Sequence, residues 1–393
     1  MKHRTIKSNI FFTGVIDWDR KLFDELIPLP EGTSYNSYIV QGSEKTALID
    51  TADPSKKKEF LKNISKIDTK IDYIISHHAE QDHSGLIPEV LNLYPDAKVI
   101  SSTQCKEMLK ELLLIDDSQF KAVEDGEAIS LGDKNLKFIY TPWVHWPETM
   151  VTYLEEDKIL FSCDFFGSHL ATSDLFVTDE PLVYRAAKRY YAEIMMPFRP
   201  FIQKDIEKLQ PLEIKLIAPS HGPIYENPDF IIEAYKDWIS DETKNEVIVP
   251  YVSMHGSTKE LADYLVDTLI DGGLTVKPFN LTTADIGDLA LALVDASTVV
   301  IATPTVLTGP HPSAVYAAYL VNALRPKLKF ASIIGSYGWG GRTVDLLKGF
   351  LTNLKAEIIE PVIVKGFPKE EDFKNIEKLA EEIVRKHKEQ NLI

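Results

Sequence analysis

The hexapeptide at residues 78–83 restricts the fold of this chain more than any other stretch. It reads His78-Ala79-Glu80-Gln81-Asp82-His83 and comes directly after a β-like run at residues 73–76. Two imidazoles and two carboxylates within six residues are a dense set of metal ligands, which a packed core does not require. Alternate residues of an extended chain point to the same side, so His78 and Glu80 can bind one cation while Asp82 and His83 reach a second one. The chain must therefore hold this loop at the end of a strand.

Three further candidate ligands follow later strand-like runs. His145 lies just after a strand that ends at Tyr140, Asp164 closes the run at residues 160–163, and His221 follows the run at residues 216–220. Any one of them alone is best explained as a structural residue at a strand end. Together with the hexapeptide they predict a site for two metal ions, because a sheet scaffold can bring such strand ends together.

The strand pattern changes near residue 245, and 393 residues are more than one ordinary domain needs. Before that point, many short apolar strands separated by turn signals and helices predict stacked sheets covered by helices. The polar segment 237–245 is the expected linker, so we expect domains at residues 1–245 and 246–393. The candidate strands of the first domain are residues 10–13, 37–40, 46–49, 73–75, 98–100, 136–140, 150–153, 159–162 and 216–218.

From residue 246 onward, strands and helices alternate regularly. Continuous apolar strands joined by helical crossovers predict a parallel sheet covered on both faces, which is a doubly wound α/β domain. The predicted strands are residues 247–252, 276–281, 298–302, 330–335 and 357–364. The predicted helices are residues 259–270, 314–324, 343–354 and 370–389.

Composition and charge exclude several classes of protein. The net charge of −16 argues against binding of nucleic acid, which needs a positive surface. Only Cys105 and Cys163 are present, without a CxxC motif, which argues against a disulfide framework, a thiolate zinc site and an iron–sulfur cluster. The N-terminus lacks an apolar leader, and no apolar run approaches the ~20 residues of a membrane span. We therefore expect a soluble, cytoplasmic protein with no membrane partner.

Three loops in the second half predict a ligand site. Residues 253–258 (Ser-Met-His-Gly-Ser-Thr) follow the first strand and open a helix. Hydroxyls, a permissive glycine and unpaired helix amides together form a phosphate cradle. In a sheet of order 2-1-3-4-5, the loops after the third and fourth strands meet this cradle at the switch point, where Tyr337 and Trp339 can stack on a planar ring. A GxGxxG fingerprint is absent, so a built-in NAD site is not supported.

The metal constellation resembles the metallo-β-lactamase-like fold, an αββα sandwich with the pattern His-x-His-x-Asp-His and distant His, Asp and His. Here Glu80 replaces the second histidine. Mixed imidazole and carboxylate ligands suit non-haem iron, so the replacement favours iron redox chemistry over zinc hydrolysis. We expect His83 to be the ligand that most easily turns away and leaves water in its place. The expected ligands are His78, Glu80 and His145 for one iron, Asp82, His83 and His221 for the other, and Asp164 as a bridge.

The second domain resembles flavodoxin, which implies FMN as a cofactor. The expected FMN-binding residues lie in the three loops that follow the first, third and fourth strands. They are Ser253, Met254, His255, Gly256, Ser257, Thr258, Thr303, Pro304, Thr305, Val306, Thr308, Gly309, Ser336, Tyr337, Gly338, Trp339, Gly340 and Gly341.

The combination of both halves resembles the flavodiiron proteins (A-type flavoproteins) over almost the whole chain. The stretches that carry the likeness are residues 78–85, 141–147 (Thr-Pro-Trp-Val-His-Trp-Pro), 161–164 (Phe-Ser-Cys-Asp), 219–222 (Pro-Ser-His-Gly) and 253–258. The resemblance implies an oxidoreductase with two iron ions and FMN that reduces O₂ to water or NO to N₂O. It also implies a small redox donor such as rubredoxin and a head-to-tail homodimer or a dimer of dimers.

The residues of the substrate pocket match the family less closely. The family tends to carry a stretch with His and Tyr near its N-terminus that helps to form this pocket, whereas residues 22–26 read Leu-Phe-Asp-Glu-Leu. His169, Tyr190 and Tyr191 match catalytic or pocket positions only loosely, and each fits plain packing about equally well. The sequence therefore leaves the preference between O₂ and NO open.

Two alternatives of other classes remain. One is a zinc-dependent hydrolase of the same fold with an accessory flavodoxin domain, and the other is an electron-carrier flavoprotein whose first domain holds no metal. Glu80 and the FMN loops weigh against the hydrolase, and the complete set of seven ligands weighs against the carrier. Iron, zinc and flavin contents of the purified protein would separate the three hypotheses.

Overall fold

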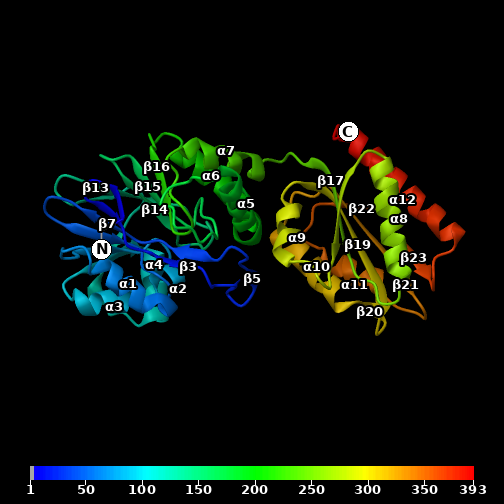
Figure 1. The fold of residues 1–393 in the computed structure, drawn as a ribbon, viewed down its shortest axis with the longest axis horizontal. Coiled ribbons are helices and arrows are strands. Elements are labelled where there is room, and N and C mark those ends of the chain that lie inside the picture. The colour runs from blue at the N-terminus through cyan, green and yellow to red at the C-terminus, as the bar shows by residue number, and fades with distance from the viewer. Residues whose placement is uncertain (1–3) are drawn as a thin grey trace. The chain divides into compact units, whose positions relative to one another are not determined.

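The computed structural model describes residues 4–393, which form two compact units (Figure 1). The first unit comprises the chain up to Tyr190 together with Phe198–Ile239. The second comprises Ser240–Ile393 and the short segment Tyr191–Pro197. Each unit has its own sheets and its own core, so each is described separately.

The first unit is built around two sheets. One has the order β1-β2-β7-β8-β9-β10-β11 and the other the order β12-β13-β14-β15-β16. The strands of the first sheet are β1 (Arg4–Lys7), β2 (Ile10–Phe12), β7 (Tyr38–Gln41), β8 (Thr46–Ile49), β9 (Tyr73–Ile75), β10 (Lys98–Ser102) and β11 (Phe120–Val123). Those of the second are β12 (Ala128–Ser130), β13 (Asn135–Tyr140), β14 (Met150–Leu154), β15 (Ile159–Cys163) and β16 (Leu216–Pro219).

Side chains alternate between two cores along the central strands of the first sheet. Leu48 and Ile74 pack with residues of the covering helices, such as Phe60. Ile49 and Ile75, one position further on, pack with side chains of the second sheet, such as Phe161. This period of two is what a strand buried on both faces requires. The first unit is therefore a sandwich with helices outside, which confirms the predicted fold class.

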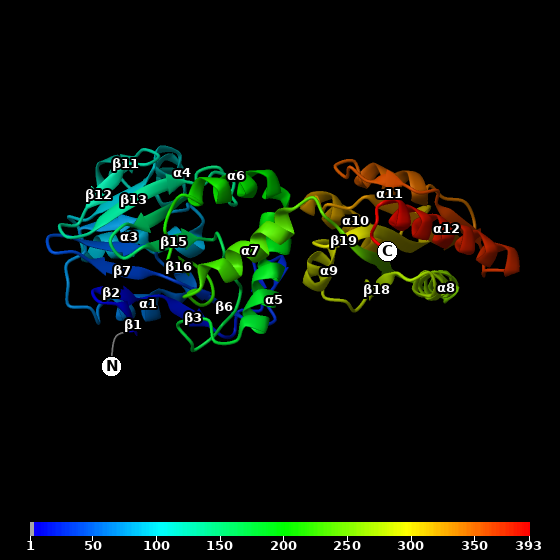
Figure 2. The same cartoon turned by 90° about the horizontal axis from the view of Figure 1, so that it is seen from above.

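Helices and short hairpins complete the first unit. Both views place α5, α6 and α7 beside the second sheet (Figures 1 and 2). The helices are α1 (Lys57–Ile64), α2 (Gln81–Ser84), α3 (Ile87–Leu93), α4 (Thr103–Leu113), α5 (Glu180–Tyr190), α6 (Arg199–Leu209) and α7 (Pro228–Ile239). The small antiparallel pairs are β3 (Val15–Asp17) with β6 (Thr33–Tyr35), and β4 (Leu22–Phe23) with β5 (Ile27–Pro28).

The second unit is a doubly wound parallel sheet of order β18-β17-β19-β21-β22, and β23 continues the last position beside β21. Counted within the unit, this is the predicted order 2-1-3-4-5. Its strands are β17 (Lys244–Tyr251), β18 (Thr275–Asn280), β19 (Ala296–Val306), β20 (Gly309–Pro310), β21 (Phe330–Tyr337), β22 (Glu357–Ile358) and β23 (Val362–Lys365). Its helices are α8 (Ser257–Asp271), α9 (Ile286–Leu293), α10 (Pro312–Leu324), α11 (Thr343–Phe350) and α12 (Glu370–Glu389).

Several boundaries differ from those expected from the sequence. The predicted strand at residues 357–364 is split into β22 and β23 just before and after Pro361, which has no N–H for the ladder. The helix α9 was not predicted, because its eight mostly apolar residues form a run too short to distinguish a helix from a buried strand. The expected linker at residues 237–245 overlaps the end of α7 and the start of β17, so only residues 240–243 connect them.

No helix among residues 4–393 is both long enough and apolar enough to cross a lipid bilayer.

Candidate functional site

The seven candidate metal ligands all lie in the first unit, where several strand ends converge. His78 and Glu80 follow β9, and Asp82 and His83 lie on the single turn α2. The other three ligands come from the second sheet: His145 after β13, Asp164 directly after β15, and His221 two residues after the end of β16. Because β15 and β16 are parallel neighbours, their carboxyl ends bring Asp164 and His221 to the same edge.

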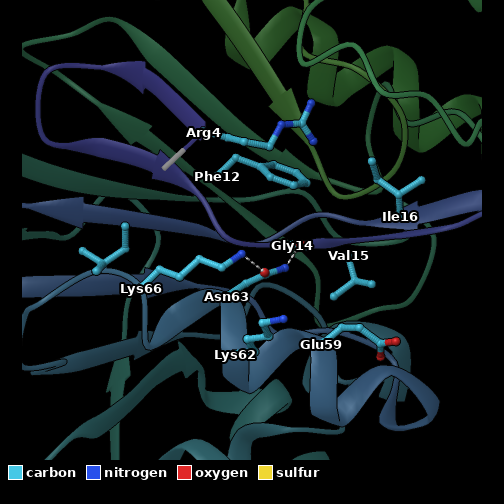
Figure 3. A pocket seen from close by; sticks show the side chains of 10 residues that line it. Arg4, Phe12, Gly14, Val15, Ile16, Glu59, Lys62, Asn63 and Lys66 are labelled. Carbon is cyan, nitrogen blue, oxygen red and sulfur yellow. Dashed lines mark hydrogen bonds between the residues drawn. The ribbon is translucent and has the colours of Figure 1, made fainter. Parts of the chain in front are cut away.

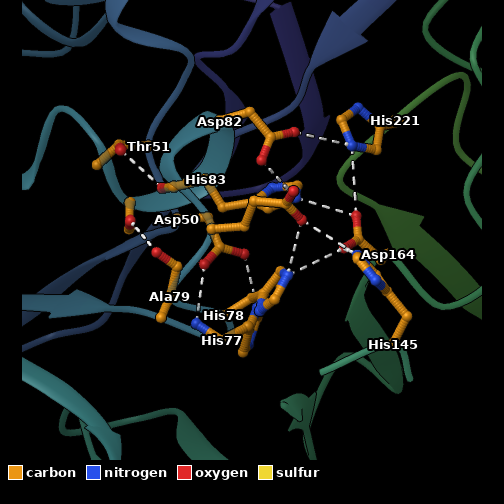
Figure 4. A network of polar contacts seen from close by, with 12 residues as sticks. Asp50, Thr51, His77, His78, Ala79, Asp82, His83, His145, Asp164 and His221 are labelled. Atoms are coloured by element: carbon orange, nitrogen blue, oxygen red, sulfur yellow. Dashed lines mark hydrogen bonds and ion pairs between the residues drawn. The ribbon is translucent and has the colours of Figure 1, made fainter. Parts of the chain in front are cut away.

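Four of these side chains form a first cluster, which comprises His78, Glu80, His145 and Asp164. Figure 4 shows three of them, His78, His145 and Asp164, with their side chains directed towards one another. The Nε2 atoms of His78 and His145 lie 3.0 and 3.1 Å from Oε2 of Glu80. The same two nitrogens lie 3.7 and 3.6 Å from Oδ2 of Asp164. Two imidazoles and two carboxylates thus point their free atoms at one small volume.

A second cluster comprises Asp82, His83 and His221. Nε2 of His83 and Nε2 of His221 each lie 3.3 Å from an oxygen of Asp82. They lie 3.0 and 3.3 Å from Oδ1 of Asp164. Asp164 therefore presents Oδ2 to the first cluster and Oδ1 to the second, which is the geometry of a bridging carboxylate. His83 is turned towards the ligands rather than away from them.

Buried atoms without hydrogen bonds test whether metal ions fit this site. Both carboxylate oxygens of Asp82 and both of Asp164 are buried and make no hydrogen bond within residues 4–393. The groups nearest these oxygens are the imidazole nitrogens of the same site, and a cation bound between them would satisfy both the anionic oxygens and the nitrogen lone pairs. The donor set of carboxylates and imidazoles suits iron. The residues present therefore fit a pair of iron ions.

The electrostatics of the site keep its carboxylates ionised. Burial acts to raise the pKa of Glu80, but its hydrogen bonds to His145 and His78 outweigh burial and hold that pKa well below its ordinary value. Burial is likewise outweighed at Asp164, where the charges of His83 and His221 lower the pKa. The same pairing raises the pKa of His78, His83 and His221, so a metal ion that binds between these groups displaces protons from the imidazoles.

The sequence analysis missed two residues that support the ligand loop, one by contacting it and one by anchoring the residue just before it. Glu148 Oε1 accepts hydrogen bonds from His78 Nδ1 (2.7 Å) and from the backbone N–H of Ala79 (3.0 Å). His77 is fully buried and bonds Asp50 through Nδ1 and Thr152 through Nε2, each at 2.7 Å. Their closeness in sequence to His78 and His145 was the one available signal, because their contacts join segments far apart in the chain.

Of the three pocket residues suggested by the resemblance, His169 and Tyr190 lie beside the ligands. The His169 ring lies 4.9 Å from the ring of His221 and 4.8 Å from that of Tyr190. Its Nδ1 bonds the Thr33 hydroxyl at 2.9 Å, while its buried Nε2 has no hydrogen-bond partner among the described residues. Tyr191 is buried too, but it begins the segment Tyr191–Pro197 that groups with the second unit.

The hairpin of β4 and β5 brings one more residue to the ligands. Phe23 packs its ring 5.2 Å from that of His169. At the tip, Asp24 and Glu25 both have left-handed backbone angles, with φ of 49° and 52°. Burial, followed by the charge of Glu80, raises the pKa of Asp24 to about 6. Residues 22–26 lack the His and Tyr that the family tends to carry, and they place an acidic side chain next to Glu80 instead.

A second candidate site lies at the carboxyl ends of β17, β19 and β21 in the second unit. It is a pocket of about 230 Å³ whose walls come from all three predicted loops. Gly256 caps α8 with φ of 93°, and no atom lies within 4 Å of the position its Cβ would take. No side chain of the described residues caps the N-terminus of this helix, so its amides and the open space suit a phosphate group.

The pocket includes some predicted FMN residues and not others. Those on its wall are Ser253, Met254, His255, Ser257, Thr258, Pro304, Thr305, Ser336, Tyr337 and Gly338, together with Gly366, which the sequence analysis missed. Gly366 follows β23, so the pocket also takes in the end of the fifth strand. The remaining predicted residues, Gly256, Thr303, Val306, Thr308, Gly309, Trp339, Gly340 and Gly341, lie in the same loops but not on this wall. Trp339 is 71% exposed.

A further hollow of about 300 Å³ lies between the first strands and α1 of the first unit (Figure 3). Several of its polar groups already have partners: the Asn63 amide donates to Gly14 O, and Lys66 donates to Asn63 Oδ1. Arg4 donates to Ser173 O and lies over the ring of Phe12. None of the predicted metal or FMN residues lines this hollow, so we assign it no role.

The chain is similar to known proteins over nearly its whole length. A family model described as ODP family beta lactamase matches residues 33–222. The chain is 36% identical to a nitric oxide reductase of Moorella thermoacetica, covering 96% of this chain and 97% of that protein. It is 32% identical to the flavo-diiron protein FprA2 of Clostridium acetobutylicum, covering 97% and 98%. The solved structure of rubredoxin oxygen:oxidoreductase from Desulfovibrio gigas superposes with a TM-score of 0.96 at 30% identity and covers all of both chains.

Proposed function

This chain belongs to the flavodiiron protein family, and we propose how its own residues carry the family's reaction. It is an oxidoreductase that reduces O₂ to water or NO to N₂O at a non-haem diiron centre, with electrons delivered through FMN. Reduction of one O₂ to two water molecules consumes four electrons and four protons. Reduction of two NO molecules to N₂O and water consumes two electrons and two protons.

The observation that carries the assignment of residues is the position of Asp164 between the two ligand clusters. Its Oδ2 faces the nitrogens of His78 and His145, and its Oδ1 faces those of His83 and His221. We therefore assign His78, Glu80 and His145 to one iron, Asp82, His83 and His221 to the other, and Asp164 to both. Residues 1–245 would form the diiron domain, and residues 246–393 the FMN domain.

A pair of iron ions, when bound, would supply electrons for the reduction. It would also offer neighbouring coordination positions for O₂ or for two NO molecules. The protein holds the ligands firmly, because five of the seven are buried near strand ends, and Glu80 and His145 are largely enclosed as well. Phe23, His169 and Tyr190 pack against one another beside His221. This enclosure would exclude bulk water from one side of the centre, with Tyr190 and His169 as its polar surfaces.

In the second unit, the pocket at the strand ends suits FMN. Ser253, Ser257 and Thr258 would bind the phosphate at the start of α8, and Tyr337 would lie against the flavin ring. The Thr258 hydroxyl and the Ser336 hydroxyl are 3.0 Å apart, so the loop before α8 and the loop after β21 stabilise each other. FMN, when bound, passes electrons onward one at a time from a two-electron store.

The main experiment measures metal and flavin contents together with turnover. We expect two iron ions and one FMN per chain. We also expect that the protein, once reduced anaerobically by a chemical or protein donor, consumes O₂ or NO when either gas is then added with the same donor. Zinc in place of iron, with hydrolytic activity, would favour the hydrolase alternative. Flavin without any metal would favour the electron carrier.

A redox donor protein is the expected partner, since related enzymes are named for such a donor. We propose a small donor of the rubredoxin type and a reducing, cytoplasmic location, with which the two buried free thiols Cys105 and Cys163 are compatible. The donor is tested by adding purified rubredoxin and following the rate at which FMN becomes reduced. A rate unchanged by rubredoxin would contradict this part of the proposal.

We also propose the head-to-tail homodimer, alone or as a dimer of dimers, in which the FMN of one subunit serves the irons of the other. Hybrid dimers test it directly. A subunit carrying D164A and a subunit carrying G256V would each be inactive alone. The hybrid would regain activity in the head-to-tail arrangement, because it combines one intact flavin with one intact iron centre. Inactive hybrids of proven mixed composition would contradict that arrangement.

A further inference from the structure

The outer nitrogens of the ligand histidines do not have equal partners. His78 donates from Nδ1 to the carboxylate of Glu148 at 2.7 Å. His221 donates from Nδ1 to the backbone carbonyl of Ser34 at 2.6 Å. Nδ1 of His83 is buried and has no hydrogen-bond partner within residues 4–393. One cluster therefore contains an imidazole backed by an anion, and the other contains imidazoles backed by a neutral carbonyl and by no polar group.

Glu148 is itself held firmly. Its side chain is fully buried and its Oε1 also accepts the backbone N–H of Ala79, the residue between His78 and Glu80. Its backbone carbonyl accepts the hydroxyl of Ser102 at 2.9 Å. Such an arrangement leaves His78 one orientation, with Nδ1 towards Glu148 and Nε2 towards the first cluster.

A purely structural role would not explain the second oxygen of this carboxylate. Oε2 of Glu148 is buried and makes no hydrogen bond to any described residue. A glutamine could accept the same two bonds at Oε1 without burying a charge, and burial of an unpaired charge is unfavourable. A carboxylate at this place is favourable when a cation lies on the far side of the imidazole ring, since the ring transmits the negative charge to the metal ligand.

We propose that Glu148 is a positioning residue that makes the two iron positions unequal, so that the position at His78, Glu80 and His145 binds iron more tightly and favours its ferric state. This inference rests on the proposed diiron function and goes beyond it. Negative charge accumulates at this position from Glu80, from a share of Asp164 and, through His78, from Glu148. The position at Asp82, His83 and His221 has no such third carboxylate behind its imidazoles.

The decisive variant is E148Q, which keeps the shape and the hydrogen-bond acceptor of the side chain and removes its charge. We expect iron affinity to fall about 10- to 100-fold, as for other groups behind metal-bound histidines. We also expect the reduction potential of one of the two irons to shift upward in a titration followed by electron paramagnetic resonance. The potential of FMN in the same sample provides the internal reference and should not move.

The matched control is D205N, which removes a buried carboxyl group of the same unit that contacts none of the seven ligands. D205N should leave iron affinity and both iron potentials unchanged. Unchanged iron affinity and unchanged potentials in E148Q would overturn the inference. An equal shift in D205N would overturn it as well, because the effect would then come from general loss of buried charge.

A measurement on the unaltered protein keeps the test valid if E148Q does not fold. Crystals treated with increasing amounts of an iron chelator can be examined by anomalous diffraction at the iron edge. We expect the iron at Asp82, His83 and His221 to leave first. Loss of the His78 iron first, or equal loss of both, would overturn the inference. Untreated protein that contains no iron would instead refute the proposed function, so the two failures are distinguishable.

Discussion

At the residue scale, Asp164 is the side chain on which both metal positions depend. It is the only residue of the site whose two oxygens face different clusters among the described residues, at 3.0 to 3.7 Å from four imidazole nitrogens. It occupies this place because β15 ends at Cys163, so the next residue projects over the edge where β16 delivers His221. A single substitution there should therefore disturb both irons.

We expect D164A to lose most of its iron and about 99% or more of its O₂ and NO turnover, while FMN binding stays normal. The physical reason is that both clusters lose a charged ligand at once, and mutual repulsion of two cations is no longer screened. Iron and flavin contents with the turnover rates check this. A variant that retained iron and turnover would show that Asp164 is not the bridge.

Asp205 on α6 gives a prediction about pH. Burial raises the pKa of its carboxyl group to about 7, and Oδ2 makes no hydrogen bond among the described residues. The pKa of Asp205 is higher in the folded chain than in the unfolded chain. Its contribution to the stability of the folded state is therefore complete below about pH 4 and is lost as the pH rises towards 7.

The variant D205N should therefore unfold with a free energy about 1–3 kcal/mol larger than the parent at pH 8 and with little difference near pH 4. Denaturant titrations at the two pH values measure this. An equal effect at both would mean that Asp205 does not titrate in the folded protein.

At the scale of elements, both sites use the ends of strands, but the two units use them differently. In the first unit, loops from two facing sheets supply the ligands, so the distances between the metal ligands depend on how the sheets pack. In the second unit, the loops all follow strands of one parallel sheet, and the start of α8 supplies the anion-binding amides. The tip of the β4–β5 hairpin adds Asp24, which the sequence alone did not bring to the ligands.

The loop before α8 can be tested through Gly256. G256V should weaken FMN binding about tenfold or more, because a β-branched residue at φ of 93° costs roughly 1–2 kcal/mol and would shift the backbone that presents the amides at the start of α8. Iron content should not change. Fluorescence titration with FMN measures the affinity.

The control for this variant is G349A in α11, where φ is not left-handed and no atom lies within 4 Å of the added methyl group. It should bind FMN normally and gain up to about 1 kcal/mol of stability. Normal FMN affinity in G256V would contradict the assignment of the phosphate loop.

At the scale of the whole molecule, each unit has a separate hydrophobic core, so damage to one site should leave the other intact. The core of the second unit joins α8 and α12 to the sheet through residues such as Leu265, Val300 and Ile383. His387, near the end of α12, is fully buried and hydrogen-bonded to Thr298 and Asn245, at 2.7 and 2.8 Å. It ties the last helix to the first and third strands of the sheet.

Burial lowers the pKa of His387 to about 4. Because the unfolded chain then binds the proton more readily, stability is lost as the pH falls from about 6.5 towards 4. We expect the second unit to lose about 1–2 kcal/mol between pH 7 and pH 5 through this residue, measured as earlier release of FMN on heating. H387Q should reduce that loss, and an unchanged pH dependence in H387Q would exclude His387 as its source.

The sequence by itself determined the fold class and the identity of the ligand types, because these depend on local patterns, and the order of the second sheet followed from the resemblance to flavodoxin. Apolar alternation, strand–helix rhythm and the six-residue run at 78–83 are all contained in short windows of the chain. The tertiary structure alone decided that Asp164 faces two clusters, that His83 turns inward, and that Glu148 and Asp24 reach His78 and Glu80. Except for the pair Asp164 and His145, those relations join residues more than 50 positions apart, and their distances depend on how two sheets and a hairpin pack, which no local pattern encodes.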